Sequence, residues 1–387
     1  MRELIILIYL TCFKITFNIC KLFPLKNKTT FLISFPENPL YLYDQLKKQN
    51  IDTSIVFLCQ QRCLDTFNQT NELTYPIDGK NMIHFFRGIF HLATSKQIIA
   101  DNYYGFLAIT KFKPSVRCIQ IWHAVGAIKQ FGIKDPSNTN RTAKAIDRFK
   151  DVYARFDQIV VGSDFMGNIF KQAFLTDDKS ILKLGVARTD FFFNREQQND
   201  IKKVLYQANP LLKEKKVILY APTFRKSKTT TVHFPLEISA MYESLKDDYL
   251  LILKLHPNVD IQTDFTKEYP DFLSDYSHYP TINNLLVITD ILITDYSSIP
   301  MEFSFFKRKM IFYAYDLEQY QLEQGFWEDY EQSVPGPVVK NTAGIVDHIL
   351  DNEIDIQKIN SYAKKWTEYC DGKASKKLVM ELFKQQR

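Results

Sequence analysis

Short apolar runs alternate with stretches of helical periodicity along most of this chain. In the first half, β-rich runs predict strands at Thr30–Phe35, Ser54–Cys59, Gln97–Asn102, Cys118–His123 and Gln158–Gly162. Helical spacing between these runs predicts helices at Leu40–Gln49, Asn81–Ser95 and Phe165–Phe174. Regular alternation of strands with helices is typical of parallel sheets joined by crossover helices.

The same alternation returns in the second half of the chain. Apolar runs predict strands at Lys216–Phe224, Tyr249–His256, Ile291–Asp295 and Met310–Tyr315. The tail from about Asp355 to Arg387 has a helical pattern. A length of 387 residues fits two domains of ordinary size, and the polar stretch Asn194–Asp200 is the predicted boundary. We therefore expect domains at 29–193 and 194–387, facing each other across a cleft.

The first 28 residues form a segment of their own. Residues 4–23 are mostly apolar and just long enough to span a membrane, but Lys14 would then lie near its centre. Thr11, Lys14, Asn18 and Lys21 recur every three or four residues, so they share one face of a helix. This pattern favours an amphipathic helix that lies on the membrane with Lys14 and Lys21 toward lipid phosphates. An ordinary buried first helix is the remaining alternative.

Composition and charge narrow the classes of function. The apolar fraction of 45% and the charged fraction of 24% are those of a globular protein. Residues 1–150 hold 20 Lys and Arg against 10 Asp and Glu, whereas the remainder holds 29 against 34. A basic first half suits an anionic membrane surface or a phosphorylated acceptor. We expect no nucleic-acid partner, because no nucleic-acid-binding motif is present. The six cysteines lack the paired spacing of a zinc site and are expected to be reduced thiols.

Polar signatures follow three of the predicted strands. They are Trp122-His123 with Gly126, His256-Pro257, and Asp295-Tyr296-Ser297-Ser298. Open α/β sheets bind their ligands at the carboxyl ends of their strands. These residues therefore predict one catalytic cleft assembled from distant parts of the chain. No dinucleotide-binding or P-loop glycine motif is present, and we expect neither a cofactor nor a metal ion.

Ser297 and Ser298 lie between a predicted strand and a predicted helix. Two hydroxyls and the free N–H groups of a helix start suit a diphosphate. The alternative is that one serine only caps the helix. His256 can stabilise charge on a phosphate, and His123 is a natural base for an acceptor hydroxyl. Either histidine could instead be hydrogen-bonded within a turn or core.

Three further cationic residues and one threonine complete the predicted site. Arg188, Arg225, Lys254 and Thr223 supply charge or hydrogen bonds for phosphates, although surface ion pairs would explain either arginine. Lys129 opens a basic run directly after the first histidine motif. A solvated helix face would explain that run, or it could meet a lipid diphosphate.

Taken in order, these motifs resemble the CDP-glycerol glycerophosphotransferase family of teichoic acid synthesis. The residues that carry the resemblance are Trp122-His123 with Gly126, Tyr220-Ala221-Pro222-Thr223-Phe224-Arg225, Lys254-Leu255-His256-Pro257 and Thr294-Asp295-Tyr296-Ser297-Ser298. The resemblance implies an α/β, GT-B-like arrangement of two Rossmann-like parallel-sheet domains facing a central cleft. It implies CDP-glycerol and an undecaprenyl-diphosphate-linked disaccharide as substrates, at the cytoplasmic face of the cell membrane.

The resemblance also implies a division of roles. His123 would be the catalytic base, and His256 would serve the donor diphosphate. The CDP-glycerol site would comprise Arg188, Thr223, Arg225, Lys254, Asp295, Ser297, Ser298 and Glu302, with Glu302 toward the ribose. Trp122, Gly126 and Lys129 would lie on the acceptor side.

The short chain and its Trp-His-Ala sequence, in place of Trp-His-Gly, are most like the priming member of the family. That member adds the first glycerol phosphate to the lipid-linked disaccharide and releases CMP. A poly(glycerol phosphate) polymerase and a CDP-ribitol user are the alternatives within the family. A sugar-nucleotide epimerase or glycosyltransferase of the same architecture, and a catalytically silent membrane scaffold, are the alternatives outside it.

Overall fold

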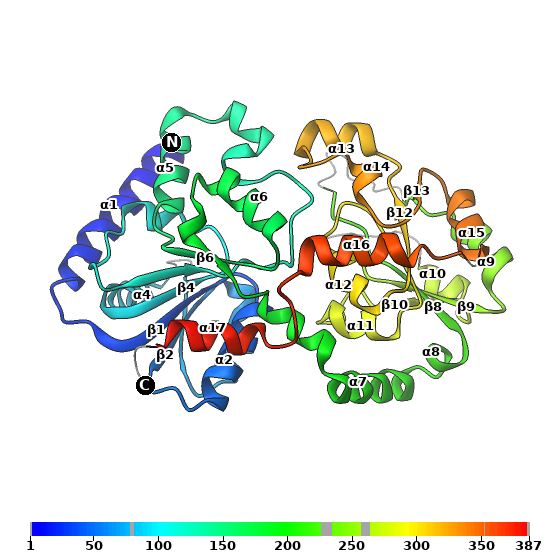
Figure 1. Cartoon of the computed structure of the whole chain (residues 1–387), viewed down its shortest axis with the longest axis horizontal. Coiled ribbons are helices and arrows are strands. Elements are labelled where there is room, and N and C mark those ends of the chain that lie inside the picture. Colours follow the sequence, from blue (N-terminus) through cyan, green and yellow to red (C-terminus); the bar gives the residue numbers. More distant parts are fainter. Residues whose placement is uncertain (1, 78–80, 226–233, 257–263, 352, 385–387) are drawn as a thin grey trace. The chain divides into compact units, whose positions relative to one another are not determined.

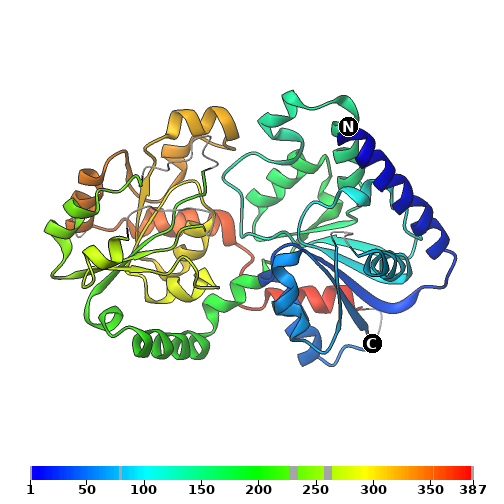
Figure 2. The ribbon, with the colours of Figure 1, turned by 180° about the vertical axis from the view of Figure 1, so that it is seen from behind.

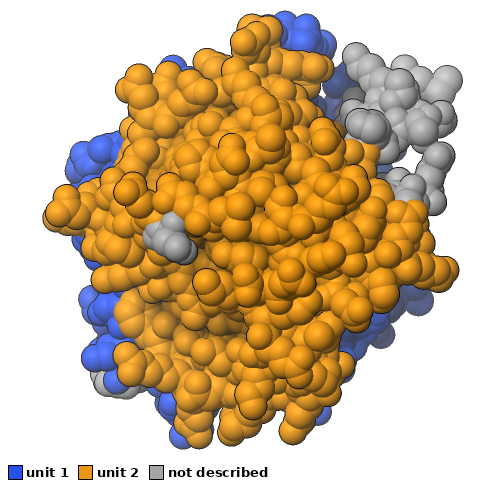
Figure 3. Space-filling model, turned by 90° about the vertical axis from the view of Figure 1, so that its right-hand side faces the viewer, with its two compact units in different colours: residues 1–125, 130–190, 367–387 blue, residues 126–129, 191–366 orange. Residues whose placement is uncertain are grey.

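The chain folds into two compact α/β units, each built on a parallel sheet (Figure 1). The computed structural model describes residues 2–77, 81–225, 234–256, 264–351 and 353–384. Unit 1 comprises residues 1–125, 130–190 and 367–387, and unit 2 comprises residues 126–129 and 191–366 (Figure 3). The prediction of an α/β fold with two parallel sheets is confirmed.

Unit 1 contains a seven-stranded sheet in the order β3-β2-β1-β4-β5-β6-β7, within the described residues. Its strands are β1 Lys26–Ile33, β2 Ser54–Cys59, β3 Leu73–Pro76, β4 Ser95–Ala100, β5 Arg117–Gln120, β6 Gln158–Val161 and β7 Ile181–Lys183. Its helices are α1 Arg2–Cys20, α2 Glu37–Lys48, α3 Leu64–Asn68, α4 Met82–Thr94, α5 Ala143–Tyr153, α6 Asp164–Phe174 and α17 Ala374–Leu382. Chain order reverses between β1 and β4, which makes that point the topological switch of the sheet.

Unit 2 repeats this topology in a six-stranded sheet with the order β10-β9-β8-β11-β12-β13, again within the described residues. Its strands are β8 Lys216–Tyr220, β9 Tyr249–Leu253, β10 Leu273–Asp275, β11 Ile291–Thr294, β12 Lys309–Tyr313 and β13 Val338–Val339. Its helices are α7 Arg195–Ala208, α8 Leu211–Glu214, α9 Ile238–Leu245, α10 Phe265–Glu268, α11 Ile282–Ile288, α12 Ile299–Phe303, α13 Leu317–Gln324, α14 Tyr330–Ser333, α15 Thr342–Leu350 and α16 Ile356–Thr367. Here the chain order reverses between β8 and β11.

The apolar runs form strands that are buried on both faces. In β8, Val217 and Leu219 enter one core of unit 2, while Ile218 and Tyr220 enter the other. Successive side chains of a strand point to opposite faces, so a strand covered on both sides must be apolar throughout. This is why continuous apolar runs, rather than alternating ones, marked these strands in the sequence.

The division of the chain differs from the expected boundaries at three places. Unit 2 begins at Phe191 rather than at residue 194, and it also includes the segment Gly126–Lys129. The last residues, 367–387, belong to unit 1, although the sequence assigned them to the second domain. The reason is burial: Leu378, Val379 and Leu382 of α17 complete the unit 1 core beside α2 (Figure 1).

Helix α1 packs along the outside of unit 1 (Figure 2). Phe13 and Phe17 are buried, and the Phe13 ring stacks on Phe106 with 4.8 Å between centroids. The predicted polar face is exposed at Lys14, but so are the aliphatic residues Leu4, Ile5, Leu7, Ile8, Ile15 and Ile19. Residues Glu3–Cys20 are long and apolar enough to cross a membrane by length and composition, with a mean hydropathy of 1.7. The helix therefore presents an aromatic face to the fold and an aliphatic face to its surroundings.

Candidate active site

One group of candidate residues lies in unit 1, where β1, β4 and β5 end. Strand β5 ends at Gln120, earlier than the sequence predicted, because Trp122 takes a left-handed backbone conformation with φ of 54°. The next residue, His123, lies beside Asp101, which follows β4, and Phe35, which follows β1. The carboxyl ends at the topological switch of unit 1 thus bring together residues from three strands.

His123 is held between two aromatic rings. Its ring stacks on Phe35 at 4.3 Å between centroids and packs on Trp122 at the same distance. Its Nδ1 lies 3.1 Å from the backbone oxygen of Asp101. A carbonyl oxygen can only accept, so Nδ1 carries the proton and Nε2 carries the lone pair. Burial lowers the pKa of His123 to about 4, with the nearby charges of Arg188 and Arg62 acting in the same direction.

Asp101 fixes the loop that carries Phe35. Its carboxylate accepts hydrogen bonds from the backbone N–H groups of Ser34 and Phe35 at 2.7–3.0 Å and from the hydroxyl of Tyr104 at 2.7 Å. Burial raises its pKa to about 7, and these hydrogen bonds oppose that rise. Arg62 reinforces the same loop, because its Nε donates to the Ser34 oxygen and its guanidinium lies 4.0 Å from the centre of the Phe35 ring.

Arg188 belongs to this histidine environment. It is 8% exposed, and its Nη1 donates to the backbone oxygen of His123 at 3.0 Å. Its backbone N–H donates to Asn38, whose amide in turn holds the backbone oxygen of Trp122 at 2.8 Å. The sequence grouped Arg188 with the donor-binding residues. Its observed contacts instead support the backbone on both sides of His123.

A second group of candidate residues lies in unit 2, at the carboxyl ends of β8, β9, β11 and β12. Thr223 follows β8, His256 follows β9, Asp295 to Ser298 follow β11, and Asp316 follows β12. His256 is exposed and packs against Phe224 with 4.5 Å between ring centroids. Pro257 lies outside the described residues. These strands are neighbours in a parallel sheet, so the residues that follow them share one edge.

Arg225 is neutralised by two carboxylates. Its guanidinium lies 2.9 Å from Asp295 and 2.8 Å from Asp316, and it also donates to the backbone oxygen of Thr223. Asp295 is fully buried and accepts from the backbone N–H of Thr223 at 2.8 Å. Burial raises the pKa of Asp295, while the Arg225 charge opposes the rise. Arg225 and Asp295 thus stabilise the turn after β8.

The two serines differ in their contacts. Ser297 Oγ accepts from the backbone N–H of Ile299, the first residue of α12, at 3.2 Å, while the N-cap position itself is Ser298. Ser298 makes no side-chain cap bond, and both serines are partly exposed. Glu302 is 3% exposed and accepts a long hydrogen bond of 3.5 Å from Asn283. Its carboxylate is directed into the unit.

The segment Gly126–Lys129 departs from its expected place. The sequence put Gly126 and Lys129 on the acceptor side with Trp122, but the structure packs both into unit 2. A Cβ on Gly126 would lie 2.3 Å from the Trp366 ring, so only glycine fits there. Lys129 pairs with Phe326 in an antiparallel bridge, and its ammonium lies 3.2 Å from the Tyr320 hydroxyl. Burial lowers the pKa of Lys129, and the charge of Asp295 opposes this.

Several residues of the site were missed from the sequence. Asp101 and Asp316 carry the same signal as His123, a polar residue close to the end of a predicted strand, and could have been found by it. Phe35 is the last residue of a predicted strand and Asn38 follows it closely, but neither is chemically distinctive. Tyr320 had no signal, because its position on α13 becomes meaningful only when its ring stacks on Tyr296 at 4.0 Å.

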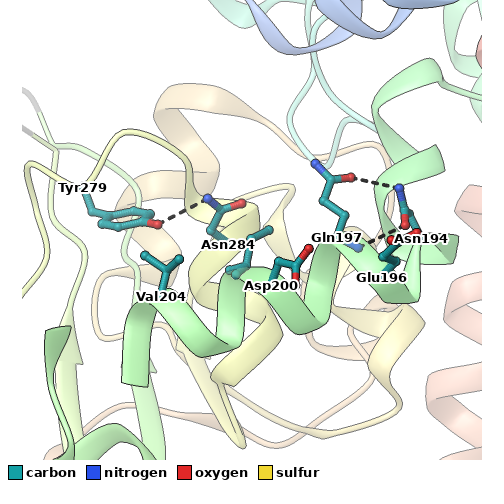
Figure 4. Close-up of a pocket in the computed structure, with 8 residues that line it drawn as sticks. Asn194, Glu196, Gln197, Asp200, Val204, Tyr279 and Asn284 are labelled. Atoms are coloured by element: carbon teal, nitrogen blue, oxygen red, sulfur yellow. Dashed lines mark hydrogen bonds between the residues drawn. The ribbon is translucent and has the colours of Figure 1, made fainter. Parts of the chain in front are cut away.

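A separate groove of about 600 Å³ lies along α7 in unit 2 (Figure 4). It is lined by Asn194, Glu196, Gln197, Asp200, Ile201, Val204, Tyr279 and Asn284. Tyr279 accepts a hydrogen bond of 3.3 Å from Asn284. None of the site residues expected from the sequence lines this groove. Its two carboxylates would repel a diphosphate, so we do not assign it to the donor.

Comparison with known proteins gives consistent matches over the chain. A family model described as CDP-Glycerol:Poly(glycerophosphate) glycerophosphotransferase matches residues 15–384. The teichoic acid glycerol-phosphate primase of Bacillus spizizenii is 36% identical over 92% of this chain and 92% of its own length. The primase of Bacillus subtilis is 34% identical over 92% and 91%. The teichoic acid ribitol-phosphate polymerase TarL of Staphylococcus aureus is 32% identical over 96% of this chain and 65% of its own length.

Solved structures show the same architecture. The wall teichoic acid polymerase TagF aligns with a TM-score of 0.77 and 23% identity over 98% of this chain and 96% of that one. The UDP-GlcNAc 2-epimerase of Neisseria meningitidis aligns with a TM-score of 0.59 and 14% identity over 92% and 100%. At these sequence identities, the structural similarity shows a shared fold and nothing more.

Proposed function

This chain belongs to the CDP-glycerol:poly(glycerophosphate) glycerophosphotransferase family, and from that premise we propose that it primes a teichoic acid chain. The membership makes it an enzyme. In the proposed reaction it transfers glycerol phosphate from CDP-glycerol to the lipid-linked disaccharide N-acetylmannosaminyl-N-acetylglucosaminyl-diphospho-undecaprenol. A hydroxyl of the disaccharide attacks the β-phosphorus, a new P–O bond forms, and the bond to the bridging oxygen breaks to release CMP.

The acceptor proton passes to Nε2 of His123 in this proposal. The observation that carries the assignment is the hydrogen bond between Nδ1 and the Asp101 oxygen, which leaves the Nε2 lone pair available. The low pKa keeps the imidazole neutral at pH 7, as a base must be before it acts. Phe35 and Trp122 hold the ring plane between them.

The donor diphosphate is proposed to bind at the carboxyl edge of the unit 2 sheet. Ser297, Ser298 and His256 are partly or fully exposed there and can donate to phosphate oxygens. Thr223, Arg225 and Asp295 support the turn beside them, and Lys254 is fixed by its bond to the Ser277 oxygen. Glu302 remains our candidate for the ribose. That His123 and these residues meet in one GT-B-like cleft stays a prediction.

Two features support a priming role. The chain is more similar to the Bacillus spizizenii primase, at 36% identity, than to TarL, at 32%. The first motif also reads Trp122-His123-Ala124 rather than Trp-His-Gly. Polymerisation and the use of CDP-ribitol are the competing activities, and the experiment below distinguishes both.

We further propose a peripheral position at the cytoplasmic face of the cell membrane. The aliphatic side of α1 is exposed, and Lys14 lies among these residues. A spanning helix would have to give up the packing of Phe13 and Phe17 against unit 1. A helix that lies in the interface keeps that packing and buries its aliphatic side in lipid.

The test is to incubate the enzyme with radiolabelled CDP-glycerol and the lipid-linked disaccharide, and then to size the product and measure CMP. We expect one glycerol phosphate per acceptor. His123→Ala should lower turnover by about 10²- to 10⁴-fold, the range for loss of a general base. His348→Ala, on α15, is the matched control and should leave turnover unchanged.

Other outcomes would decide against the proposal. Long products would identify a polymerase, and preferential competition by CDP-ribitol would identify a ribitol phosphotransferase. No CMP release with any donor would make the chain a non-catalytic scaffold. Near-normal turnover of His123→Ala would remove the base assignment while leaving the overall reaction intact.

A further inference from the structure

The segment Gly126–Lys129, which begins three residues after His123, belongs to unit 2. The backbone oxygen of Ile128 accepts from the N–H of Trp327 at 3.2 Å, and Lys129 pairs with Phe326. Gly126 fixes the start of this segment, because its missing side chain lets Trp366 and Met301 approach. The segment is therefore built into unit 2 at both ends, and Lys129 has a defined place there.

The cations expected to bind the donor are already engaged. Arg225 pairs with two carboxylates, and the ammonium of Lys254 donates to the backbone oxygen of Ser277 at 2.6 Å. Arg188 bonds to the backbone of His123 in unit 1. The observed contacts direct none of these three charges to an open position. The cations that the sequence predicted for phosphate binding are therefore largely held by protein groups.

Lys129 differs from the two arginines, which form ion pairs with carboxylates, and is like Lys254 in having an uncharged hydrogen-bond partner. Its ammonium bonds to the hydroxyl of Tyr320, and it forms no ion pair with a carboxylate among the described residues. Tyr320 in turn stacks on Tyr296, the residue directly before Ser297. Lys129 is thus tied through two aromatic rings to the loop that carries the serine pair, and the charge of Asp295 acts on it without a direct ion pair.

We propose that Lys129 is a donor-site residue that binds the diphosphate of CDP-glycerol. This inference rests on the proposed function, and it moves Lys129 from the acceptor to the donor. An unpaired ammonium at the carboxyl edge of a parallel sheet offers the complement that a diphosphate requires. A phosphate oxygen would take the place of, or join, the Tyr320 hydroxyl as its acceptor.

The competing explanation is structural. Arg225 balances only one of the charges of Asp295 and Asp316, and Lys129 could offset the other from a distance. In that case Lys129 would stabilise unit 2 without touching the donor. The two explanations predict different effects of a Lys129 substitution on the affinity for ligands with phosphate and for ligands without it.

The experiment is calorimetric titration of CDP-glycerol, CMP and cytidine into the full chain and its variants. Lys129→Ala and Lys129→Gln should lower the affinity for CDP-glycerol and for CMP by about 10- to 100-fold. This is the effect of losing a hydrogen bond to a charged group. Lys129→Arg should retain most of the affinity, and cytidine should bind all forms equally. Lys134→Ala, which removes an exposed lysine five residues later, is the control and should behave as wild type.

The outcomes separate this inference from the proposed function. If the wild type binds no CDP-glycerol, the proposed function fails and the inference fails with it. If the wild type binds and Lys129→Gln binds equally well, only the inference is overturned. A thermal shift in Lys129→Gln with unchanged affinity would establish the structural explanation, and a raised KM for the lipid acceptor alone would return Lys129 to the acceptor side.

Discussion

His123 shows how a single residue acquires its chemistry from its surroundings. A histidine in water titrates near pH 6.5, yet the enclosure of His123 by Phe35 and Trp122 lowers its pKa to about 4. The backbone oxygen of Asp101 then selects the tautomer. The sequence identified the histidine, but neither its low pKa nor its free nitrogen could be read from the motif.

The low pKa predicts a particular pH dependence of the reaction. With a pKa of about 4, nearly all His123 is free base at pH 5.5, whereas a pKa of 6.5 would leave about one tenth as free base. We therefore expect kcat/KM at pH 5.5 to stay within about twofold of its value at pH 7.5, as measured by CMP release. A tenfold loss at pH 5.5 would contradict the prediction.

Asp101 is the group that could complicate this measurement, since its pKa is about 7 and its carboxylate holds the Phe35 loop. The side chain of Asp101→Asn cannot ionise. Any loss of kcat/KM below pH 7 that persists in this variant is therefore caused by another group. The His123 shift also affects stability. Its folded pKa lies below the unfolded value, so its contribution is complete above pH 6.5 and is lost as the pH falls toward 4.

At the scale of elements, α1 illustrates both the use and the limit of sequence periodicity. The spacing of Thr11, Lys14 and Asn18 predicted one polar face, and these residues are exposed. The periodicity did not separate the remaining apolar residues into two groups. Phe13 and Phe17 face the fold, whereas Leu7 and Ile15 do not, because the complementary rings of Phe106 and Phe112 exist only in the folded unit.

The proposed interfacial position of α1 predicts a defined response to substitution. Leu7→Ser with Ile15→Ser should lower binding to anionic lipid vesicles by at least about tenfold, because each exposed aliphatic side chain loses its burial in lipid. Lys14→Glu should weaken binding to anionic but not to zwitterionic vesicles. Co-sedimentation measures both effects.

Leu322→Ser is the control for α1, because Leu322 is 84% exposed on α13 of unit 2. It should not change vesicle binding. Unaltered co-sedimentation of the α1 double variant would refute the interfacial proposal. Retention in membranes after alkaline carbonate extraction would instead indicate a spanning helix.

At the scale of the whole molecule, the order of residues in the chain does not decide the unit to which they belong. The tail returns to unit 1, where Asp190 accepts from the backbone N–H groups of Ala374 and Ser375 and so caps the start of α17. Asp190 is also the last residue of unit 1 before the chain enters unit 2. One carboxylate thus ties the start of α17 to the point at which the chain leaves unit 1 after Asp190.

This arrangement predicts that a core mutation near the end of the chain destabilises the first unit. Leu378→Ala should cost about 2–5 kcal/mol, because Leu378 is 1% exposed in the unit 1 core. Hydrogen exchange should increase in β1, β2 and β4 and remain unchanged in β8 and β9.

Met380→Ala, on the same helix but 43% exposed, is the matched control for Leu378→Ala and should leave exchange unchanged. Faster exchange confined to unit 2 would show that the tail belongs with the second half of the chain, as the sequence division had it.

The sequence by itself determined the class of fold, the inner strands of both sheets and the polar residues at their ends, but it did not predict the short edge strands β3, β7, β10 and β13. These properties are local: a strand buried on both faces must be a continuous apolar run, and a polar residue after it must lie at the sheet edge. Only the tertiary structure decided where α17 and the segment Gly126–Lys129 belong, which side of α1 is covered, and that Arg225 is neutralised. Those outcomes depend on contacts between residues far apart in the chain, such as Gly126 with Trp366, which no local pattern encodes.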